Sequence, residues 1–298
     1  MNKGGLTHVP QETPRCVGVL AEELQRLLDD SSLRQSYEII AALLDVPRFW
    51  PSANAETLVD DRLSEDAFAA AVRLREGAPF AYAVRRAPFR HLTLDVDERV
   101  LIPRPETELL VEEVLRLVPH AKGTAVDIGT GSGAIALALA SEGSFERVVA
   151  TDVSLDALAV ARRNASVLAG ALRTPVEFRH GSLLAPVRDV RAAVIVSNPP
   201  YIAFSEAGEL PASVRDWEPA VALLSGDNGM TATREVVRDA ADILHPGGLL
   251  ALEVDTRRAS LVAELLAIDP RYEAIAVRLD LTGRERFVVA RRRSDAGR

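Results

Sequence analysis

Short apolar segments that read as strands alternate with helix-like segments from Ala125 onward, and this alternation restricts the possible folds more than any other feature of the chain. Units of strand, helix and strand favour a parallel sheet with helices on both faces. Seven segments have the length and apolar content of strands, namely 125–128, 147–152, 176–180, 192–198, 248–254, 273–279 and 286–291. Helices are predicted at 133–141, 154–169, 230–244 and 257–268. We therefore predict an α/β fold with a seven-stranded, mostly parallel sheet.

The first hundred residues have a different pattern. Residues 1–16 are polar and are predicted to be a flexible tail. Apolar side chains recur at helical spacing over 17–77, which predicts a small helical domain; core packing explains these stripes, and docking of a protein substrate is the alternative. Within it, Ser64 precedes two acidic residues and is a candidate N-cap. Alternating apolar residues predict a β-hairpin linker over 78–103, and 104–298 form the second domain.

Composition excludes several classes of protein. The chain has 298 residues, of which 48% are hydrophobic, so it is not disordered. It has 35 Lys plus Arg against 43 Asp plus Glu, a net charge of −8, which disfavours direct binding of nucleic acid. Its single cysteine, Cys16, excludes an intrachain disulfide and a cysteine zinc cluster. No signal peptide and no membrane span is visible, so we expect a cytoplasmic protein without membrane contact.

A loop with three glycines, Gly-Thr-Gly-Ser-Gly at 129–133, follows the first predicted strand of the sheet. Glycine adopts positive φ freely and lets a ligand lie against the backbone. The spacing G-x-G-x-G differs from the G-x-G-x-x-G of dinucleotide-binding proteins. Asp152 ends the next strand, about 20 residues further on, where a carboxylate can bind both hydroxyls of a ribose. An adenosine-containing ligand is therefore predicted, with NAD and S-adenosylmethionine both compatible with Asp152.

A second motif, Asn198-Pro199-Pro200-Tyr201, ends the fourth predicted strand of the sheet. The two prolines fix φ, remove two amide donors and favour an extended residue before them. The side-chain oxygen of Asn198 and the carbonyl of Pro199 are thus available as acceptors beside an aromatic ring. A planar NH2 group, which has two donors, fits this arrangement. Because the motif contains no His, Lys or Cys, catalysis by orientation and acceptor dipoles is expected in place of a strong base.

Together these motifs resemble the class I S-adenosylmethionine-dependent methyltransferases, which have a Rossmann-like fold. Two further segments narrow the resemblance to the HemK/PrmC family: Leu-Ile-Pro-Arg-Pro-Glu-Thr-Glu at 101–108 and Trp-Glu-Pro-Ala-Val-Ala-Leu at 217–223. The similarity extends from about 34 to 291 and is strongest from 100 to 230. This family methylates the side-chain amide of the glutamine in the Gly-Gly-Gln loop of class 1 peptide chain release factors.

The resemblance implies S-adenosylmethionine as methyl donor, S-adenosylhomocysteine as product, no metal, and class 1 release factors as partners. It implies that the glutamine amide is bound by the catalytic residues Asn198, Pro199, Pro200 and Tyr201. The implied donor-binding residues are Gly129, Thr130, Gly131, Ser132, Gly133, Asp152, Leu183, Asn198, Arg104, Thr107 and Glu108. Family members often have an acidic and an aromatic residue near the adenine, where this chain has Ser182 and Leu183, so we expect an apolar adenine contact.

Three alternatives remain at this level. A DNA or RNA adenine N6-methyltransferase uses the same Asn-Pro-Pro-Tyr grip on a flipped base, but this chain has only two lysines and 5% aromatic residues for target recognition. A glutamine methyltransferase of a ribosomal protein is disfavoured by the segment 101–108. A non-catalytic S-adenosylmethionine-binding protein would need the glycine loop but not the motif 198–201.

Overall fold

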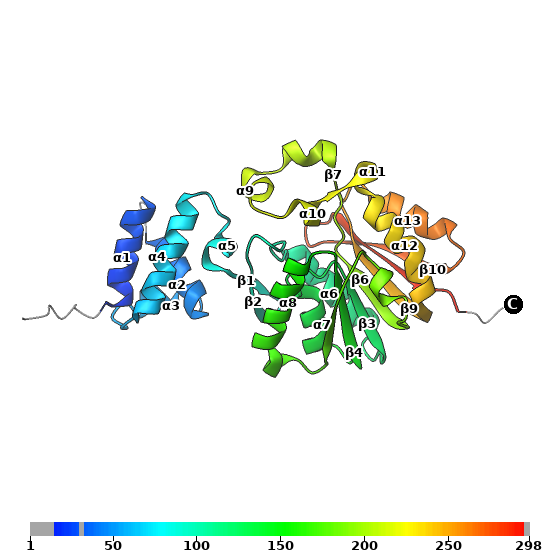
Figure 1. The fold of residues 1–298 in the computed structure, drawn as a ribbon, viewed down its shortest axis with the longest axis horizontal. Helices are drawn as coiled ribbons and strands as arrows, with labels where there is room; N and C mark the ends of the chain where they lie inside the picture. The colour runs from blue at the N-terminus through cyan, green and yellow to red at the C-terminus, as the bar shows by residue number, and fades with distance from the viewer. Residues whose placement is uncertain (1–14, 30–32, 295–298) are drawn as a thin grey trace, which may run out of the picture. The chain divides into compact units, whose positions relative to one another are not determined.

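A computed structural model of the chain describes residues 15–29 and 33–294, which belong to two compact units (Figure 1). One unit ends at Val84 and the other begins at Arg85. The tail predicted for residues 1–16 lies outside the described residues except for its last two. This boundary divides the predicted linker 78–103: its first residues, which form a short helix (Phe80–Val84), belong to the helical unit, and the hairpin belongs to the sheet unit. Over the ranges described, no helix has the length and apolar character needed to cross a membrane.

The first unit is helical, as its periodicity predicts. Its helices are α1 (Val17–Leu28), α2 (Arg34–Leu44), α3 (Trp50–Ala53), α4 (Asp61–Arg75) and α5 (Phe80–Val84). The apolar stripes of α1, α2 and α4 form one core, in which Leu24, Ile39 and Ala70 are completely buried. Residues three and four apart lie on one face of a helix, so each stripe is buried against the other two.

The prediction that Ser64 is an N-cap is wrong. Helix α4 begins one turn earlier, and its N-cap is Asp60, whose carboxylate accepts a hydrogen bond from the Leu63 N–H at 2.7 Å. Asp60 has extended backbone, so its side chain can fold back onto an N–H that has no partner within the helix. Ser64 lies inside the first turn, buried, and its hydroxyl donates to the Asp60 carbonyl at 3.1 Å.

The second unit is built on a sheet of seven strands within the described ranges, which confirms the predicted α/β fold. The strands are β3 (Thr124–Ile128), β4 (Arg147–Asp152), β5 (Val176–His180), β6 (Ala192–Ser197), β9 (Leu244–Glu253), β10 (Tyr272–Leu279) and β11 (Glu285–Arg292). Their order is β10-β11-β9-β6-β3-β4-β5, and all neighbours pair in parallel except β11, which runs antiparallel to β9 and β10. Most central strands are buried along their whole length, which is why they appear as unbroken apolar runs.

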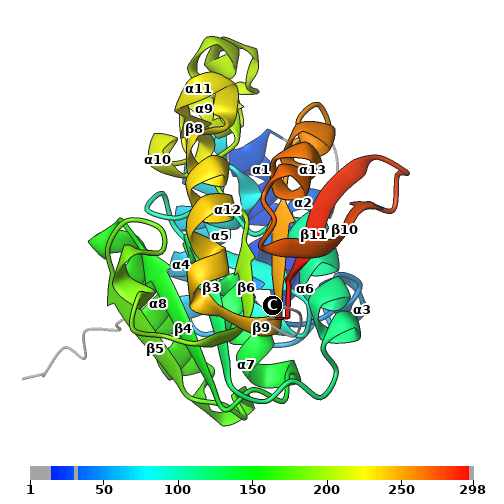
Figure 2. The same ribbon diagram turned by 90° about the vertical axis from the view of Figure 1, so that its right-hand side faces the viewer.

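Helices cover both faces of this sheet (Figure 2). Helices α6 (Pro105–Leu117), α7 (Ala134–Glu142) and α8 (Leu155–Val167) lie on one face, and α12 (Thr231–Ile243) and α13 (Ala259–Ile268) lie on the other. Helix α6 is absent from the sequence prediction. Its signals are Pro105 at the first helical position, with Glu106 and Glu108 in the first turn, where a helix favours proline and negative charge.

The predicted hairpin is confirmed as β1 (Arg86–Phe89) paired antiparallel with β2 (Leu92–Asp95). Arg90 and Asn164 are two of the side chains that attach it to the rest of its unit. Arg90 in its turn donates to both carboxylate oxygens of Glu142 on α7, each at 2.7 Å. Asn164 on α8 bonds both backbone groups of Asp95 and also donates to the carbonyl of Ser132 at 2.9 Å. The hairpin therefore supports the glycine loop from behind.

Between β6 and α12 the chain forms a run of short elements that the sequence did not predict. They are β7 (Ile202–Ala203), η3 (Phe204–Glu209), α9 (Ala212–Arg215), α10 (Ala220–Leu223), β8 (Leu224–Ser225) and α11 (Gly226–Gly229). Strands β7 and β8 pair in parallel, which closes this segment on itself. Two single 3-10 turns, η1 (Ala169–Ala171) and η2 (Ala185–Val187), lie elsewhere in the sheet unit.

The cap of α4 gives a stability prediction. Asp60→Ala should lower the free energy of unfolding by about 1 kcal/mol, because the Leu63 N–H loses its acceptor. The matched variant Ser64→Ala should change it by less than about 0.5 kcal/mol, because alanine is the best helix former and only one local bond is lost. Urea unfolding followed by Trp50 fluorescence in a Trp217→Phe background measures both. A larger loss from Ser64→Ala than from Asp60→Ala would contradict the assignment of the cap.

Candidate active site

Three loops meet at one edge of the sheet because β3, β4 and β6 are parallel neighbours. Ile128, the last residue of β3, pairs with Thr151 of β4 and with Ser197 of β6. The glycine loop, Asp152 and the motif 198–201 therefore leave the sheet at the same level. In parallel sheets such an edge, outside the carboxyl ends of the strands, is where ligands bind.

The glycine loop needs its glycines for two different reasons. Gly129, Gly131 and Gly133 all have positive φ, between +55° and +87°. A Cβ atom added to Gly129 or Gly131 would meet no atom within 4 Å, so both backbones face open space. At Gly133 an added Cβ would lie 3.1 Å from the side chain of Leu137 and 3.3 Å from Ala161. The first two glycines thus leave room for a ligand, and the third permits close packing of the helix.

Asp152 connects this loop to the end of β4. One carboxylate oxygen accepts the Gly131 N–H at 2.9 Å, and the other accepts the Ser154 N–H at 2.8 Å. The side chain is only partly buried. Because each carboxylate oxygen can accept more than one hydrogen bond, Asp152 still has acceptor capacity toward a ligand.

Asp127 lies beneath the loop and is completely buried. Burial raises the pKa of its carboxyl to about 7, although hydrogen bonds from the Thr130 hydroxyl (2.6 Å) and the Ala136 N–H (3.1 Å) oppose the rise. Its second oxygen has no hydrogen-bond partner among the residues described. The Thr130 side chain therefore points into the protein and fixes the loop from below.

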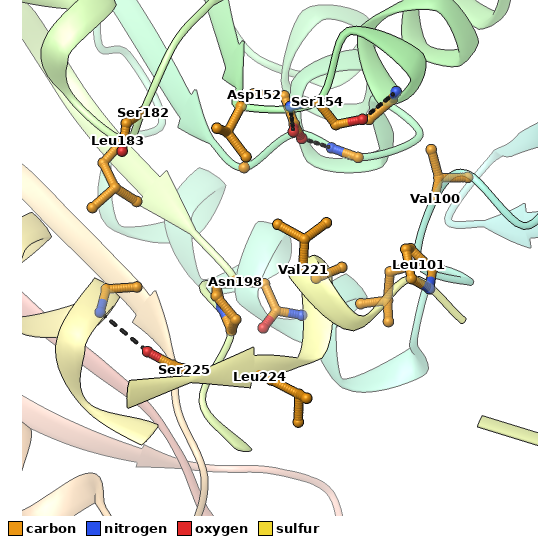
Figure 3. Close-up of a pocket in the computed structure, with 18 of the residues that line it drawn as sticks. Val100, Leu101, Asp152, Ser154, Ser182, Leu183, Asn198, Val221, Leu224 and Ser225 are labelled. Carbon is orange, nitrogen blue, oxygen red and sulfur yellow. Dashed lines mark hydrogen bonds between the residues drawn. The ribbon is translucent and has the colours of Figure 1, made fainter. Parts of the chain in front are cut away.

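A cavity of about 360 Å³ opens beside these loops (Figure 3). In Figure 3, Asp152 and Ser154 stand on one side of it and Asn198 on the opposite side, with Leu183 at one end. Of the donor-binding residues implied by the sequence, the cavity brings together Gly129, Gly131, Asp152, Leu183 and Asn198.

The other implied donor-binding residues do not line this cavity. Thr130, Ser132 and Gly133 are buried within the loop. Thr107 is buried behind Asn198, and Arg104 lines a neighbouring cavity. Glu108 is half-buried on α6, where its carbonyl accepts a hydrogen bond from Arg90.

Leu183 has an unusual backbone conformation for a residue with a side chain, with φ of +46°. Its carbonyl accepts the Thr151 hydroxyl at 3.1 Å, which holds the loop after β5 against β4. Positive φ at a leucine is costly and is found mainly where the surroundings require it. Here the conformation places an apolar side chain on the cavity wall beside Ser182.

Asn198 is the first residue after β6 and its amide is fixed in one orientation. Its Nδ2 donates to the hydroxyl of Thr107 at 3.2 Å. Its Oδ1 receives no hydrogen bond from any residue in the described ranges. The side chain therefore presents a vacant acceptor at the cavity.

Tyr201 ends the motif and is held by a glycine from another segment. A Cβ atom at Gly229 would lie 2.1 Å from the Tyr201 carbonyl oxygen, so only glycine fits there. The Tyr201 side chain is partly buried, and this burial raises the pKa of its hydroxyl to about 12. The residue is therefore neutral at physiological pH.

A second, smaller cavity of about 180 Å³ adjoins the first. Its wall includes Arg104, Tyr201 and Ile202. The two cavities share Leu101, Asn198 and Ala222, so Asn198 lies where they meet.

An ion pair joins the two segments on which the family resemblance rests. Nη2 of Arg104 donates to Oε1 of Glu218 at 2.5 Å, and the second oxygen of this buried carboxylate accepts the Ile102 N–H at 3.3 Å. Breaking such a pair would leave an uncompensated buried charge. The pair therefore keeps 101–108 and 217–223 together beside both cavities.

Several wall residues were missed by sequence reasoning. They are Arg99, Val100, Leu101, Val153, Ser154, Ala157, Pro219, Val221, Ala222, Leu224, Ser225, Gly226, Thr231, Ala232 and Glu235. The segment 217–223 was the available signal for Pro219 to Ala222. The other apolar residues of the wall could not be distinguished from core residues by the sequence pattern. In the ranges described, no group of three or more His, Cys, Asp or Glu side chains could hold a metal ion.

The chain is similar in sequence to known methyltransferases. Residues 105–210 match the family model "Methyltransferase small domain". The release factor glutamine methyltransferase of Moorella thermoacetica is 43% identical over 224 residues, covering 75% of this chain and 78% of that protein. The protein of the same name from Xylella fastidiosa is 39% identical and covers 83% of this chain and 89% of its own.

A solved methyltransferase from Pyrococcus furiosus shares the fold, with a TM-score of 0.50 at 20% identity; the match covers 67% of this chain and 88% of that one. The chain belongs to the release factor glutamine methyltransferase family.

Proposed function

We propose that the chain transfers a methyl group from S-adenosylmethionine to the side-chain amide nitrogen of the glutamine in the Gly-Gly-Gln loop of class 1 release factors, in the cytoplasm. The observation that supports this most directly is the vacant Oδ1 of Asn198 at the meeting point of two cavities. One cavity is large enough for the donor, and the other admits a smaller group. The relatives' names supply the substrate class.

The larger cavity fits S-adenosylmethionine in shape and chemistry. Gly129 and Gly131 form a cradle that any Cβ atom would partly fill, and this suits the methionine part of the donor. Asp152 has acceptor capacity for the two ribose hydroxyls. Leu183 offers an apolar surface to adenine. The chemistry that the donor supplies when bound is an electrophilic methyl group on a positively charged sulfur.

The smaller cavity would hold the glutamine side chain. An amide nitrogen is a poor nucleophile because its lone pair is delocalised into the carbonyl. Oδ1 of Asn198 and the carbonyl of Pro199 accept its two N–H groups, and this orientation can lower the barrier by roughly 7 to 11 kcal/mol at best. The same acceptors stabilise positive charge on the nitrogen, by about 3 to 4 kcal/mol per group. The lost proton goes to water, because Tyr201 is neutral and the motif contains no base.

Incubation with labelled S-adenosylmethionine tests the function. We expect one methyl group per class 1 release factor, located by mass spectrometry on the glutamine of Gly-Gly-Gln. A release factor in which that glutamine is alanine should take up none. Separate arms with ribosomes and with DNA test the alternatives, and incorporation into either without incorporation into the release factor would contradict the proposal.

Asp152→Ala should weaken binding of S-adenosylhomocysteine by roughly 10- to 100-fold, because hydrogen bonds to a charged acceptor are lost. Isothermal titration calorimetry measures the change. Asp156→Ala is the matched control, because Asp156 is an exposed first-turn acid of α8 that does not line the cavity. Equal affinities for the Asp152 variant and the parent would remove Asp152 from the donor site.

Asn198→Ala should lower the single-turnover rate of methyl transfer by about 100- to 1,000-fold, since it deletes an acceptor at the reacting nitrogen. Affinity for S-adenosylhomocysteine should stay within about threefold of the parent, because Asp152 and the glycine loop are unchanged. Rapid-quench measurement with the release factor gives the rate. A parent-like rate would show that the role assigned to Asn198 is wrong.

A further inference from the structure

Three side chains from three elements form a hydrogen-bonded chain behind the reaction motif. Nδ2 of Asn198, after β6, donates to Oγ1 of Thr107 on α6 at 3.2 Å. The Thr107 hydroxyl donates to Oε2 of Glu253, the last residue of β9, at 2.7 Å. Thr107 is 5% exposed and Glu253 is 1% exposed, so water has little access to the bond between them.

The two hydrogen bonds run in one direction, from Asn198 through Thr107 to Glu253, because a hydroxyl has a single proton to donate. An ionised carboxylate can only accept hydrogen bonds, so the Thr107 hydroxyl must donate its hydrogen bond to Glu253. The hydroxyl then has only lone pairs to offer Asn198, and only the NH2 end of the amide can meet them. The oxygen end is consequently turned away from Thr107. Figure 3 shows the Asn198 amide at the cavity.

We infer that Glu253 is a positioning residue that acts through Thr107: its ionised form selects the orientation of Asn198 in which Oδ1 faces the nitrogen to be methylated. This inference rests on the proposed function, in which that nitrogen is an NH2 donor. Neither Glu253 nor its hydrogen bond to Thr107 belongs to the sequence motif of the site. The bond joins positions 146 residues apart in the chain.

Protonation of Glu253 would reverse the direction of both hydrogen bonds at Thr107. The carboxylic acid can donate to Oγ1 of Thr107, which frees the hydroxyl proton to bond Oδ1 of Asn198. The amide then turns its NH2 group toward the substrate NH2, and two donors face each other. Such a pair cannot form a hydrogen bond. The enzyme in which Glu253 is protonated, and the relay of Asn198, Thr107 and Glu253 is reversed, should therefore be inactive.

The surroundings of Glu253 make this switch relevant near neutral pH. Burial raises the pKa of its carboxyl to about 7, with a smaller upward contribution from Glu106 on α6. The Thr107 hydrogen bond, Arg286 on β11 and Arg104 before α6 lower it. Tyr201, after β6, is neutral, and Asp255 two residues beyond Glu253 has its pKa lowered and stays ionised. The ionised fraction therefore rises with pH through about 7.

The test is the single-turnover rate of release factor methylation between pH 5.5 and 9, with donor saturating. The parent rate should rise with pH through the region of the Glu253 pKa and then level off. Glu253→Gln keeps the volume but cannot ionise, so its rate should be lower and should lack this rise. Thr107→Val keeps the shape without the hydroxyl and should lose roughly tenfold in rate. Thr107→Ser should recover most of that loss.

Two measurements distinguish a changed orientation of Asn198 from damage to the fold in these variants. Affinity for S-adenosylhomocysteine should stay close to that of the parent in the Thr107 and Glu253 variants, since the donor cavity wall contains neither residue. Thr124→Val is the matched control, because Thr124 is a buried threonine at the opposite end of β3 whose hydroxyl accepts from Arg147. It should retain the parent's pH profile.

The outcomes are distinguishable. A parent enzyme that methylates no release factor overturns the proposed function and this inference with it. An active parent whose rise with pH persists unchanged in Glu253→Gln overturns the role of Glu253 alone. A parent-like rate in Thr107→Val shows that the orientation of Asn198 does not depend on the relay.

Discussion

Parallel pairing of β3 with β4 on one side and β6 on the other is the constraint on which the site depends. The register aligns Ile128 with Thr151 and Ser197, so three chain segments leave the sheet at one level. The loops are then fixed by backbone acceptors: the Thr151 carbonyl takes the N–H groups of Gly129 and Thr130, each at 2.9 Å. A shift of one residue in either pairing would turn every side chain of the shifted strand to the opposite face and separate the acceptors.

In the proposed mechanism neutral dipoles act on the substrate amide, while an ion pair holds together two segments around them. Asn198 offers an amide oxygen, and Tyr201 is kept neutral by burial. Arg104, on the wall of the smaller cavity, is paired with Glu218. Because the Glu218 carboxylate is buried, this pair fixes the position of two distant segments more than it raises stability. The chain's net charge of −8 therefore has little bearing on the chemistry.

Much of the sheet could be predicted because its central strands are buried on both faces and read as continuous apolar runs. The position of the glycine loop and Asp152 beside one cavity could be predicted, because the loop follows β3 directly and Asp152 ends the parallel strand β4. Capping was harder: Asp60 and Ser64 are both good cap types, and only the backbone geometry decides between them. Contacts between distant segments were beyond sequence reasoning. Nothing in the local pattern connects Thr107 to Glu253, or Arg104 to Glu218, since each pair forms only after the chain has folded.

The most direct test of the account is a crystal structure of the enzyme with S-adenosylhomocysteine and a release factor presenting its Gly-Gly-Gln loop. The glutamine nitrogen should lie about 2.7 to 3.2 Å from Oδ1 of Asn198 and from the Pro199 carbonyl, with the ribose hydroxyls on Asp152. A glutamine nitrogen bound away from Asn198, or a ribose that does not contact Asp152, would contradict it.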